Sequence, residues 1–210
     1  GGGKTATNLA RELGIESHME QGRRITDRAM LDVVTMVYGG LVNKKIVSGL
    51  QARGCNALGL TGADLNLISA RKRPVGEIDY GFVGDVEDVN SRELRMLIKE
   101  NVVPVVAPLT HDGKGNLLNT NADTIAAELA TELADYFQVF LFYCFEKKGV
   151  LHYPDDENSI IHELDAETFG KLNLEGIISA GMIPKIEIGF NAKKNGVKEV
   201  LITNTHDLSN

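Results

Sequence analysis

The chain opens on residues that could bind an anion. Gly1, Gly2 and Gly3 directly precede a run at 4–13 whose apolar residues recur at helical spacing. Glycine lets a backbone approach a phosphate closely, and a helix N-terminus offers N–H groups and partial positive charge. A glycine run is a weak signal by itself, and this one matches neither the P-loop nor the dinucleotide fingerprint. A remnant of an expression tag explains the same residues.

Two arginines stand in the segment 22–26, which reads GRRIT and lies between two predicted helices. A guanidinium can hold a carboxylate through two parallel hydrogen bonds, which suits an amino-acid substrate. On spacing alone, a solvated basic loop explains these arginines as well. The segment is therefore a candidate carboxylate site, and its chemistry depends on where the fold places it.

Two amides and a carboxylate gather where a helix is predicted to begin. Asn119, Asn121 and Asp123 fall within five residues of one another, and the helix is predicted over 121–134. Such a group could orient a polar ligand. Capping of the helix by Asn121 and compensation of its dipole by Asp123 explain the same residues.

Two lysines could face phosphate groups. Lys185 lies in the first turn of a helix predicted over 183–195, just after Gly181. A cation there opposes the helix dipole, and a bound anion would relieve that conflict. Lys148 follows an apolar strand predicted over 137–144. Ordinary solvated lysines remain the alternative at both positions.

The elements that must position these residues alternate between strands and helices. Strands are predicted at 57–61, 102–107, 137–144 and 197–203, and helices at 4–13, 27–52, 91–100, 121–134, 165–172 and 183–195. Two strand-like runs within 65–90 predict a β-hairpin excursion. The alternation predicts an α/β fold with an open, mostly parallel sheet and helices on both faces, a three-layer sandwich. Ligands of such sheets bind beyond the carboxyl ends of the strands.

Composition excludes several classes of protein. The 210 residues are 43% hydrophobic and 24% charged, which is ordinary for a globular protein. The net charge of -7 argues against a nucleic-acid partner. No apolar run approaches the roughly 20 residues that span a bilayer, and no signal peptide is visible, so we expect a cytoplasmic protein without a membrane partner. The five histidines lack the spacing of a metal site.

Five segments resemble the amino acid kinase family in their order and spacing. They are 1–3 (the end of a His-Gly-Gly-Gly run), 22–26 (Gly-x-Arg-x-Thr), 81–84 (a Gly-Phe-Val-Gly hairpin), 119–123 (Asn-x-Asn-Ala-Asp) and 181–185 (Gly-Met-x-x-Lys). The resemblance extends from residue 1 to about residue 203. It implies an ATP-dependent kinase of arginine biosynthesis that phosphorylates the side-chain carboxylate of N-acetyl-L-glutamate. Mg²⁺ would be held mainly by the nucleotide.

The resemblance also implies the roles of the substrate-side residues. Arg24 would bind the α-carboxylate, and Asn119 and Asn121 would hold the amide and carboxylate end of the substrate. Gly1 and Gly2 would donate backbone N–H groups to the transferring phosphoryl group. The attacking carboxylate is already ionised at neutral pH, so alignment and charge neutralisation suffice and no general base is needed.

On the nucleotide side, Lys185 would neutralise charge and Asp123 would position the lysines of the site. Lys148, Gly181 and Glu146 would lie near the nucleotide. Phe145-Glu146 departs from the family's usual Ser/Thr-Asp at this point, so the contact of Glu146 is the weakest of these inferences.

We expect two lobes, with residues 1–134 binding the acylated amino acid and residues 135–210 binding ATP. The family's first strand, with its Lys and Gly-Gly, is not in the sequence, so we expect the first lobe to lack its first strands. The family forms homodimers or larger homo-oligomers. Two alternatives stay open: a kinase for another acylated acidic amino acid, such as succinylglutamate or an aminoadipate derivative, and a catalytically silent sensor.

Overall fold

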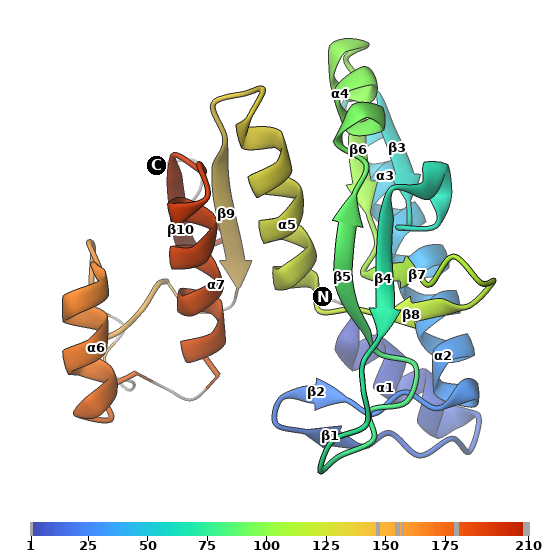
Figure 1. Cartoon of the computed structure of the whole chain (residues 1–210), viewed down its shortest axis with the longest axis horizontal. Helices are drawn as coiled ribbons and strands as arrows, with labels where there is room; N and C mark the ends of the chain where they lie inside the picture. Colours follow the sequence, from blue (N-terminus) through green and yellow to red (C-terminus); the bar gives the residue numbers. More distant parts are fainter. Residues whose placement is uncertain (1, 146–147, 154–155, 157, 179–180, 208–210) are drawn as a thin grey trace. The chain divides into compact units, whose positions relative to one another are not determined.

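The computed structural model describes residues 2–145, 148–153, 156, 158–178 and 181–207. The chain forms two compact units, Gly1–Ile125 and Ala126–Asn210 (Figure 1). The first unit ends inside a helix, whereas the expected lobe boundary fell at the end of that helix. Which unit binds which ligand stays a prediction.

The helices of the first unit follow the predicted periodicity. They are α1 (Gly3–Glu12), α2 (Arg28–Val34), η1 (Thr35–Val42), α3 (Asn43–Gln51) and α4 (Ser91–Lys99). The segment predicted as one helix over 27–52 is continuous, but its middle, η1, is a π-helix around Gly39 and Gly40. Asp27 caps α2, since its Oδ1 accepts a hydrogen bond from the Met30 N–H at 2.7 Å.

The strands of this unit form both parallel and antiparallel pairs. β3 (Ala57–Leu60) pairs in parallel with β6 (Val103–Val106). A four-stranded sheet has the order β5-β4-β7-β8, formed by Gly84–Val89, Ile68–Lys72, Leu109–His111 and Leu117–Asn119. Its antiparallel β4–β5 pair is the predicted hairpin excursion. Two two-residue strands, β1 (Met19–Glu20) and β2 (Arg23–Arg24), form a small hairpin that was not predicted.

The core of the first unit joins α1, the α2–η1 segment and β7. Its fully buried members are Ala6, Ala10, Met30, Leu31, Val33, Val34, Val37 and Leu109. The small side chains of Ala6 and Ala10 bring α1 close to α2, and the valines fill the face of the long helix. This packing fixes the start of α1 beside the hairpin that carries Arg24.

The second unit is a two-stranded parallel sheet with helices. α5 (Ala122–Ala134) leads into it, followed by β9 (Phe140–Phe145), α6 (Ala166–Leu174), α7 (Ile183–Lys194) and β10 (Glu199–Asn204). β9 and β10 pair in parallel from Phe140 with Glu199 to Phe145 with Asn204. The α/β class, the open sheets and the hairpin excursion are therefore confirmed.

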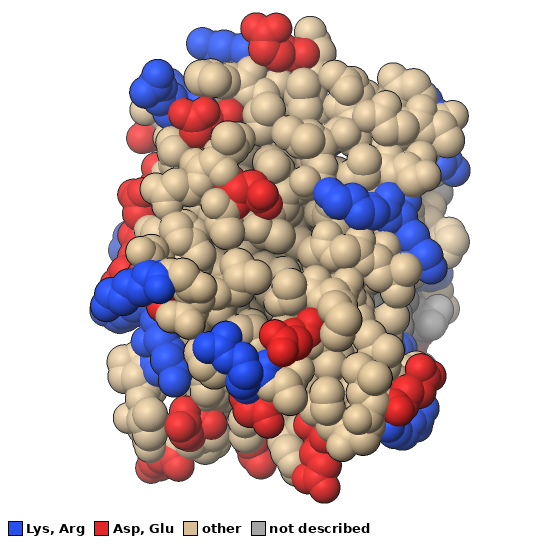
Figure 2. Space-filling view, turned by 90° about the vertical axis from the view of Figure 1, so that its right-hand side faces the viewer, with Lys and Arg blue, Asp and Glu red and all other residues tan. Residues whose placement is uncertain are grey.

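Charge is distributed without a dominant sign on the face seen in Figure 2. Uncharged residues cover most of its centre, and basic and acidic side chains both lie around it. Among the helices that the structure describes, none is long and apolar enough to cross a membrane.

Candidate active site

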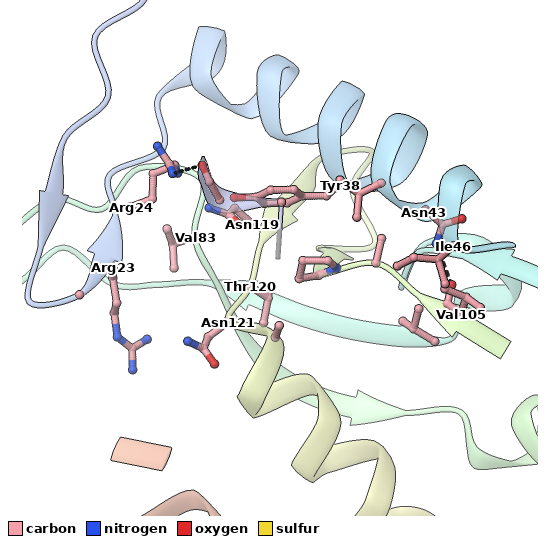
Figure 3. A pocket seen from close by; sticks show the side chains of 18 of the residues that line it. Arg23, Arg24, Tyr38, Asn43, Ile46, Val83, Val105, Asn119, Thr120 and Asn121 are labelled. Atoms are coloured by element: carbon pink, nitrogen blue, oxygen red, sulfur yellow. Dashed lines mark hydrogen bonds between the residues drawn. The ribbon is translucent and has the colours of Figure 1, made fainter. Parts of the chain in front are cut away.

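A cavity of about 380 Å³ lies in the first unit, beyond the carboxyl end of β6. This is where an open α/β sheet is expected to bind its ligand. Its wall is formed by Gly2, Gly3, Met19, Gly22, Arg23, Arg24, Tyr38, Val42, Asn43, Ile46, Val83, Val105, Val106, Ala107, Pro108, Asn119, Thr120, Asn121 and Ala122. Arg24 and Asn119 lie at one end of the cavity, and Asn43 and Ile46 lie at the other (Figure 3).

Arg24 is held firmly on the cavity wall. It is 8% exposed and lies on β2. Its Nη2 donates to the carbonyl of Gly3 at 3.2 Å and to Oγ1 of Thr7 at 3.0 Å, while its Nη1 donates to Ser17. The bonds to Gly3 and Thr7 fasten the guanidinium to the first two turns of α1. A guanidinium has five N–H donors, so donors remain with which it can bind a carboxylate.

The two predicted asparagines reach the same cavity from consecutive elements. Asn119 ends β8, and its Nδ2 donates to Oγ1 of Thr26 at 3.0 Å. Asn121 caps α5, because its Oδ1 accepts a hydrogen bond from the Thr124 N–H at 3.0 Å. The capping explanation is therefore correct for the oxygen of Asn121, and it leaves the Nδ2 group as the donor that can serve a ligand.

Gly2 stands where no side chain fits. A Cβ atom placed on Gly2 would lie 2.8 Å from Cδ1 of Tyr38 and 3.2 Å from Cγ2 of Val42. The backbone of Gly2 thus runs against η1 at the cavity wall, at the start of α1. The N–H groups at the start of a helix and the helix dipole favour an anion there.

If the Gly2 backbone faces the phosphoryl group as the motif predicts, Gly2→Ala should lower kcat by about 100-fold, because a displacement of even about 1 Å misaligns the reacting groups. Steady-state kinetics would measure it. Gly3→Ala is the matched control, since a Cβ there meets no protein atom within 4 Å. An equal fall in kcat in both variants would show that the close contact of residue 2 with Tyr38 does not cause it.

Arg23 belongs to the motif at 22–26, which indicates no role for it, and the structure places it on the cavity wall beside Arg24. Burial lowers the pKa of the Arg23 guanidinium, and the neighbouring cation of Arg73 lowers it further, while Asp85 and Tyr80 act in the opposite direction. Arg23 stays charged at neutral pH. Its surroundings disfavour that charge, so a bound anion would stabilise it.

Tyr38 is another wall residue that the sequence did not reveal. It belongs to a segment whose helical pattern indicated only core packing, and it lies on the π-helix and lines the cavity. Figure 3 shows its ring between the Arg24 end and the Asn43 end. The doublet Gly39-Gly40, directly after it, was the only sequence signal of an irregularity there.

The remaining predicted residues lie elsewhere or outside the described ranges. Asp123 is in the first turn of α5 but does not line the cavity. Lys185 lies in the first turn of α7, with its Nζ 5.9 Å from the centre of the Tyr143 ring. Lys148 borders a second cavity of about 400 Å³, within the second unit. Gly181 lies in the turn before α7.

Gly1 and Glu146 lie outside the described residues, so their predicted roles stay predictions. The same holds for the roles of Asp123, Lys148, Gly181 and Lys185. In the part of the chain that the structure describes, no three His, Cys, Asp or Glu side chains gather in a way that could hold a metal ion.

Comparisons with known proteins agree with this geometry. The model of the amino acid kinase family matches residues 1–204. The acetylglutamate kinase of Phocaeicola vulgatus is 62% identical over 203 residues, which are 97% of this chain and 79% of the relative. The acetylglutamate kinase of Methanopyrus kandleri is 40% identical over 99% of this chain and 85% of its own length.

Two solved structures share the fold. The protein smu.665 of Streptococcus mutans UA159 matches with a TM-score of 0.84 at 27% identity, over 96% of this chain and 79% of that one. N-acetylglutamate synthase of Neisseria gonorrhoeae, complexed with coenzyme A and N-acetyl-glutamate, matches with a TM-score of 0.80 at 22% identity, over 97% and 45% of the two chains. The second likeness concerns the fold alone.

The chain therefore belongs to the amino acid kinase family, and within it to the acetylglutamate kinases. The predicted family and fold are confirmed.

Proposed function

We propose that the protein phosphorylates the side-chain carboxylate of N-acetyl-L-glutamate with ATP, a step of arginine biosynthesis. The observation that carries this proposal is the convergence of Arg24, Asn119, Asn121 and Gly2 on one cavity. These residues come from separate segments, and together they offer a carboxylate clamp, two amides and a phosphoryl-facing backbone. The relatives named acetylglutamate kinase, at up to 62% identity, support the same reaction.

The chemistry needs orientation rather than proton transfer. A carboxylate oxygen of the substrate attacks the γ-phosphorus, the new O–P bond forms, and the bond from that phosphorus to the β–γ bridging oxygen breaks to release ADP. Arg24 would bind the α-carboxylate and so leave the side chain as the only carboxylate free to react. The N–H groups at Gly2 would stabilise the charge of the transferring group.

ATP would bind mainly through the second unit, with Lys185 and Lys148 near its phosphates and Gly181 at the start of α7. Lys185 would neutralise charge that the transition state places on the phosphates, and Asp123 would orient it. Mg²⁺ would accompany ATP, held chiefly by phosphate oxygens. Gly1 would donate its backbone N–H to the phosphoryl group, and Glu146 would lie near the nucleotide.

Substrate analogues test the proposal. ADP release by the full-length protein should require N-acetylglutamate and should stop with N-acetylglutamine, whose side chain has no carboxylate. ADP release with both compounds would mean that the side-chain carboxylate is not the acceptor.

One observation favours a second candidate substrate. Arg23 lies on the cavity wall next to the proposed α-carboxylate clamp. A succinyl group is an acetyl group extended by a CH2 and a carboxylate, and Arg23 could bind that carboxylate. N-succinyl-L-glutamate is therefore the alternative that the site supports, and nothing in it favours an aminoadipate derivative or a sensor.

Replacing Arg23 separates the two candidates. If the succinyl compound is the substrate, Arg23→Leu should lower kcat/KM for it by about 10–100-fold, the usual effect of losing a charge-assisted hydrogen bond, with little change for the acetyl compound. Arg71→Leu is the control, because Arg71 is exposed and does not line the cavity. An equal change for both compounds would exclude a carboxylate-reading role for Arg23.

We also propose a homodimer or larger homo-oligomer in the cytoplasm. Exposed apolar side chains of the first unit support self-association: Met36 and Leu41 on η1 and Leu58 on β3 are 51%, 45% and 39% exposed. Sedimentation would show a single monomeric species if this proposal is wrong.

A further inference from the structure

Thr26 is the most completely enclosed polar residue at the cavity's Arg24 end, at 0% exposure. It follows β2 and forms an isolated bridge with Gly81. Its N–H donates to the carbonyl of Tyr80 at 3.0 Å, and its carbonyl accepts from the N–H of Phe82 at 2.6 Å. The segment 80–82 therefore fixes the backbone of Thr26 on both sides.

Glycine at position 81 makes this close approach possible. Its φ is +72°, and a Cβ there would lie 2.3 Å from the carbonyl oxygen of Thr26. The next carbonyl along, that of Phe82, accepts a hydrogen bond from the N–H of Asn119 at 2.9 Å. The backbone of residues 80–82 thus bonds both to Thr26, which follows Arg24, and to Asn119 at the end of β8.

The side chain of Thr26 closes the connection. Its hydroxyl donates to the carbonyl of Arg24 at 3.0 Å and accepts a hydrogen bond from Nδ2 of Asn119 at 3.0 Å. The bond to the Arg24 carbonyl is buried, and the bond to Asn119 is partly buried at the cavity wall, so losing the hydroxyl leaves a buried carbonyl without its partner. The hydroxyl thus touches both the strand that carries Arg24 and the side-chain amide of Asn119.

The bond to Nδ2 also sets which way the Asn119 amide faces. If the amide flipped, its Oδ1 would face the hydroxyl of Thr26, which could donate to it only by giving up its bond to the buried carbonyl of Arg24. Asn119 therefore keeps a fixed arrangement of its carbonyl oxygen and its second N–H toward the cavity. That arrangement is what an acylated amino group, with one N–H and one carbonyl, requires for recognition.

We propose that Thr26 is a positioning residue, whose buried hydroxyl holds Arg24 and Asn119 in register for the acylated amino acid. This inference rests on the proposed function and assigns a role to a residue that touches neither the phosphoryl group nor ATP. It predicts that loss of the hydroxyl weakens binding of the acylated amino acid selectively.

Thr26→Val keeps the shape of the side chain and removes both bonds. We expect KM for the acylated glutamate to rise roughly 10–100-fold, the range for buried hydrogen-bonding groups left unpaired, while KM for ATP stays constant. Thr26→Ser should restore most of the lost affinity, since it keeps the hydroxyl. Thr26→Ala gives the same test if valine prevents folding.

The control is Thr61→Val. The Thr61 hydroxyl donates to Oδ2 of Asp64 at 2.8 Å and neither residue lines the cavity, so its loss should lower the melting temperature without a selective change in KM. A double-mutant cycle with Asn119→Ala adds a second readout: if Thr26 acts through Asn119, Thr26→Val should have a much smaller effect in that background. Strict additivity, or equal changes in both KM values, would overturn the proposal.

A measurement without turnover separates this inference from the proposed function. In the free protein, NMR should show the Asn119 side-chain amide protons as resolved and slowly exchanging, and Thr26→Val should abolish that protection. Lost protection in a protein that turns over no acylated glutamate would defeat the function and leave the positioning geometry standing. Unchanged protection would defeat the positioning role whatever the substrate.

Discussion

Arg24→Lys should raise KM for N-acetylglutamate by about 100-fold, equivalent to about 2.7 kcal/mol of lost binding, and leave KM for ATP unchanged. Lysine keeps the charge, but its ammonium has three N–H donors, too few to replace the bonds to Gly3, Thr7 and Ser17 and also to bind a carboxylate. Steady-state kinetics with each substrate varied in turn would measure the effect.

The control for this variant is Arg71→Lys, the same change at an exposed position outside the cavity. Circular dichroism would check that Arg24→Lys is folded, because two bonds of Arg24 anchor α1 and a third holds Ser17. A fall in kcat with unchanged KM for N-acetylglutamate would contradict the proposed clamp, since a ground-state contact acts on binding.

Lys185→Met should produce the opposite kinetic pattern. Methionine keeps the length and apolar stem of lysine but removes the charge near the N-terminus of α7, where bound phosphates would need it. We expect kcat to fall by about 100- to 1,000-fold, the usual loss when one group that stabilises transition-state charge is removed. KM for N-acetylglutamate should change little.

Lys194→Met is the control, because it makes the same replacement in the last turn of the same helix. It removes an exposed charge far from the first turn, and its activity should match that of the wild type. If Lys185→Met loses no more activity than Lys194→Met, Lys185 has no part in phosphoryl transfer.

The sequence predicted well what depends on local periodicity. The helix over 4–13 was foreseen because Leu9, Ala10 and Leu13 recur at helical spacing, and α1 spans Gly3–Glu12. The hairpin β4–β5 was foreseen from its turn signals. The strands β1, β2, β7 and β8 were not foreseen, because runs of two or three residues are too short to show a period.

The cavity itself depended on contacts between distant segments. Thr26 and Asn119 are 93 residues apart and share one hydrogen bond, which no local pattern encodes. Family motifs located Arg24, Asn119 and Asn121 but not their mutual support. The sequence did not identify Arg23, because β2 is too short to show which of its two arginines faces a ligand. It did not identify Tyr38, because a regular helical pattern around that residue indicated only packing.

The central claim is that a carboxylate of an acylated glutamate becomes an acyl phosphate. Trapping with hydroxylamine tests it most directly, because hydroxylamine converts an acyl phosphate to a hydroxamate. With the full-length protein, ATP, Mg²⁺ and N-acetylglutamate or N-succinylglutamate, hydroxamate should accumulate in step with ADP, and omission of the acylated amino acid should abolish both. ADP release without hydroxamate, or no ATP-dependent product with either compound, would contradict the account.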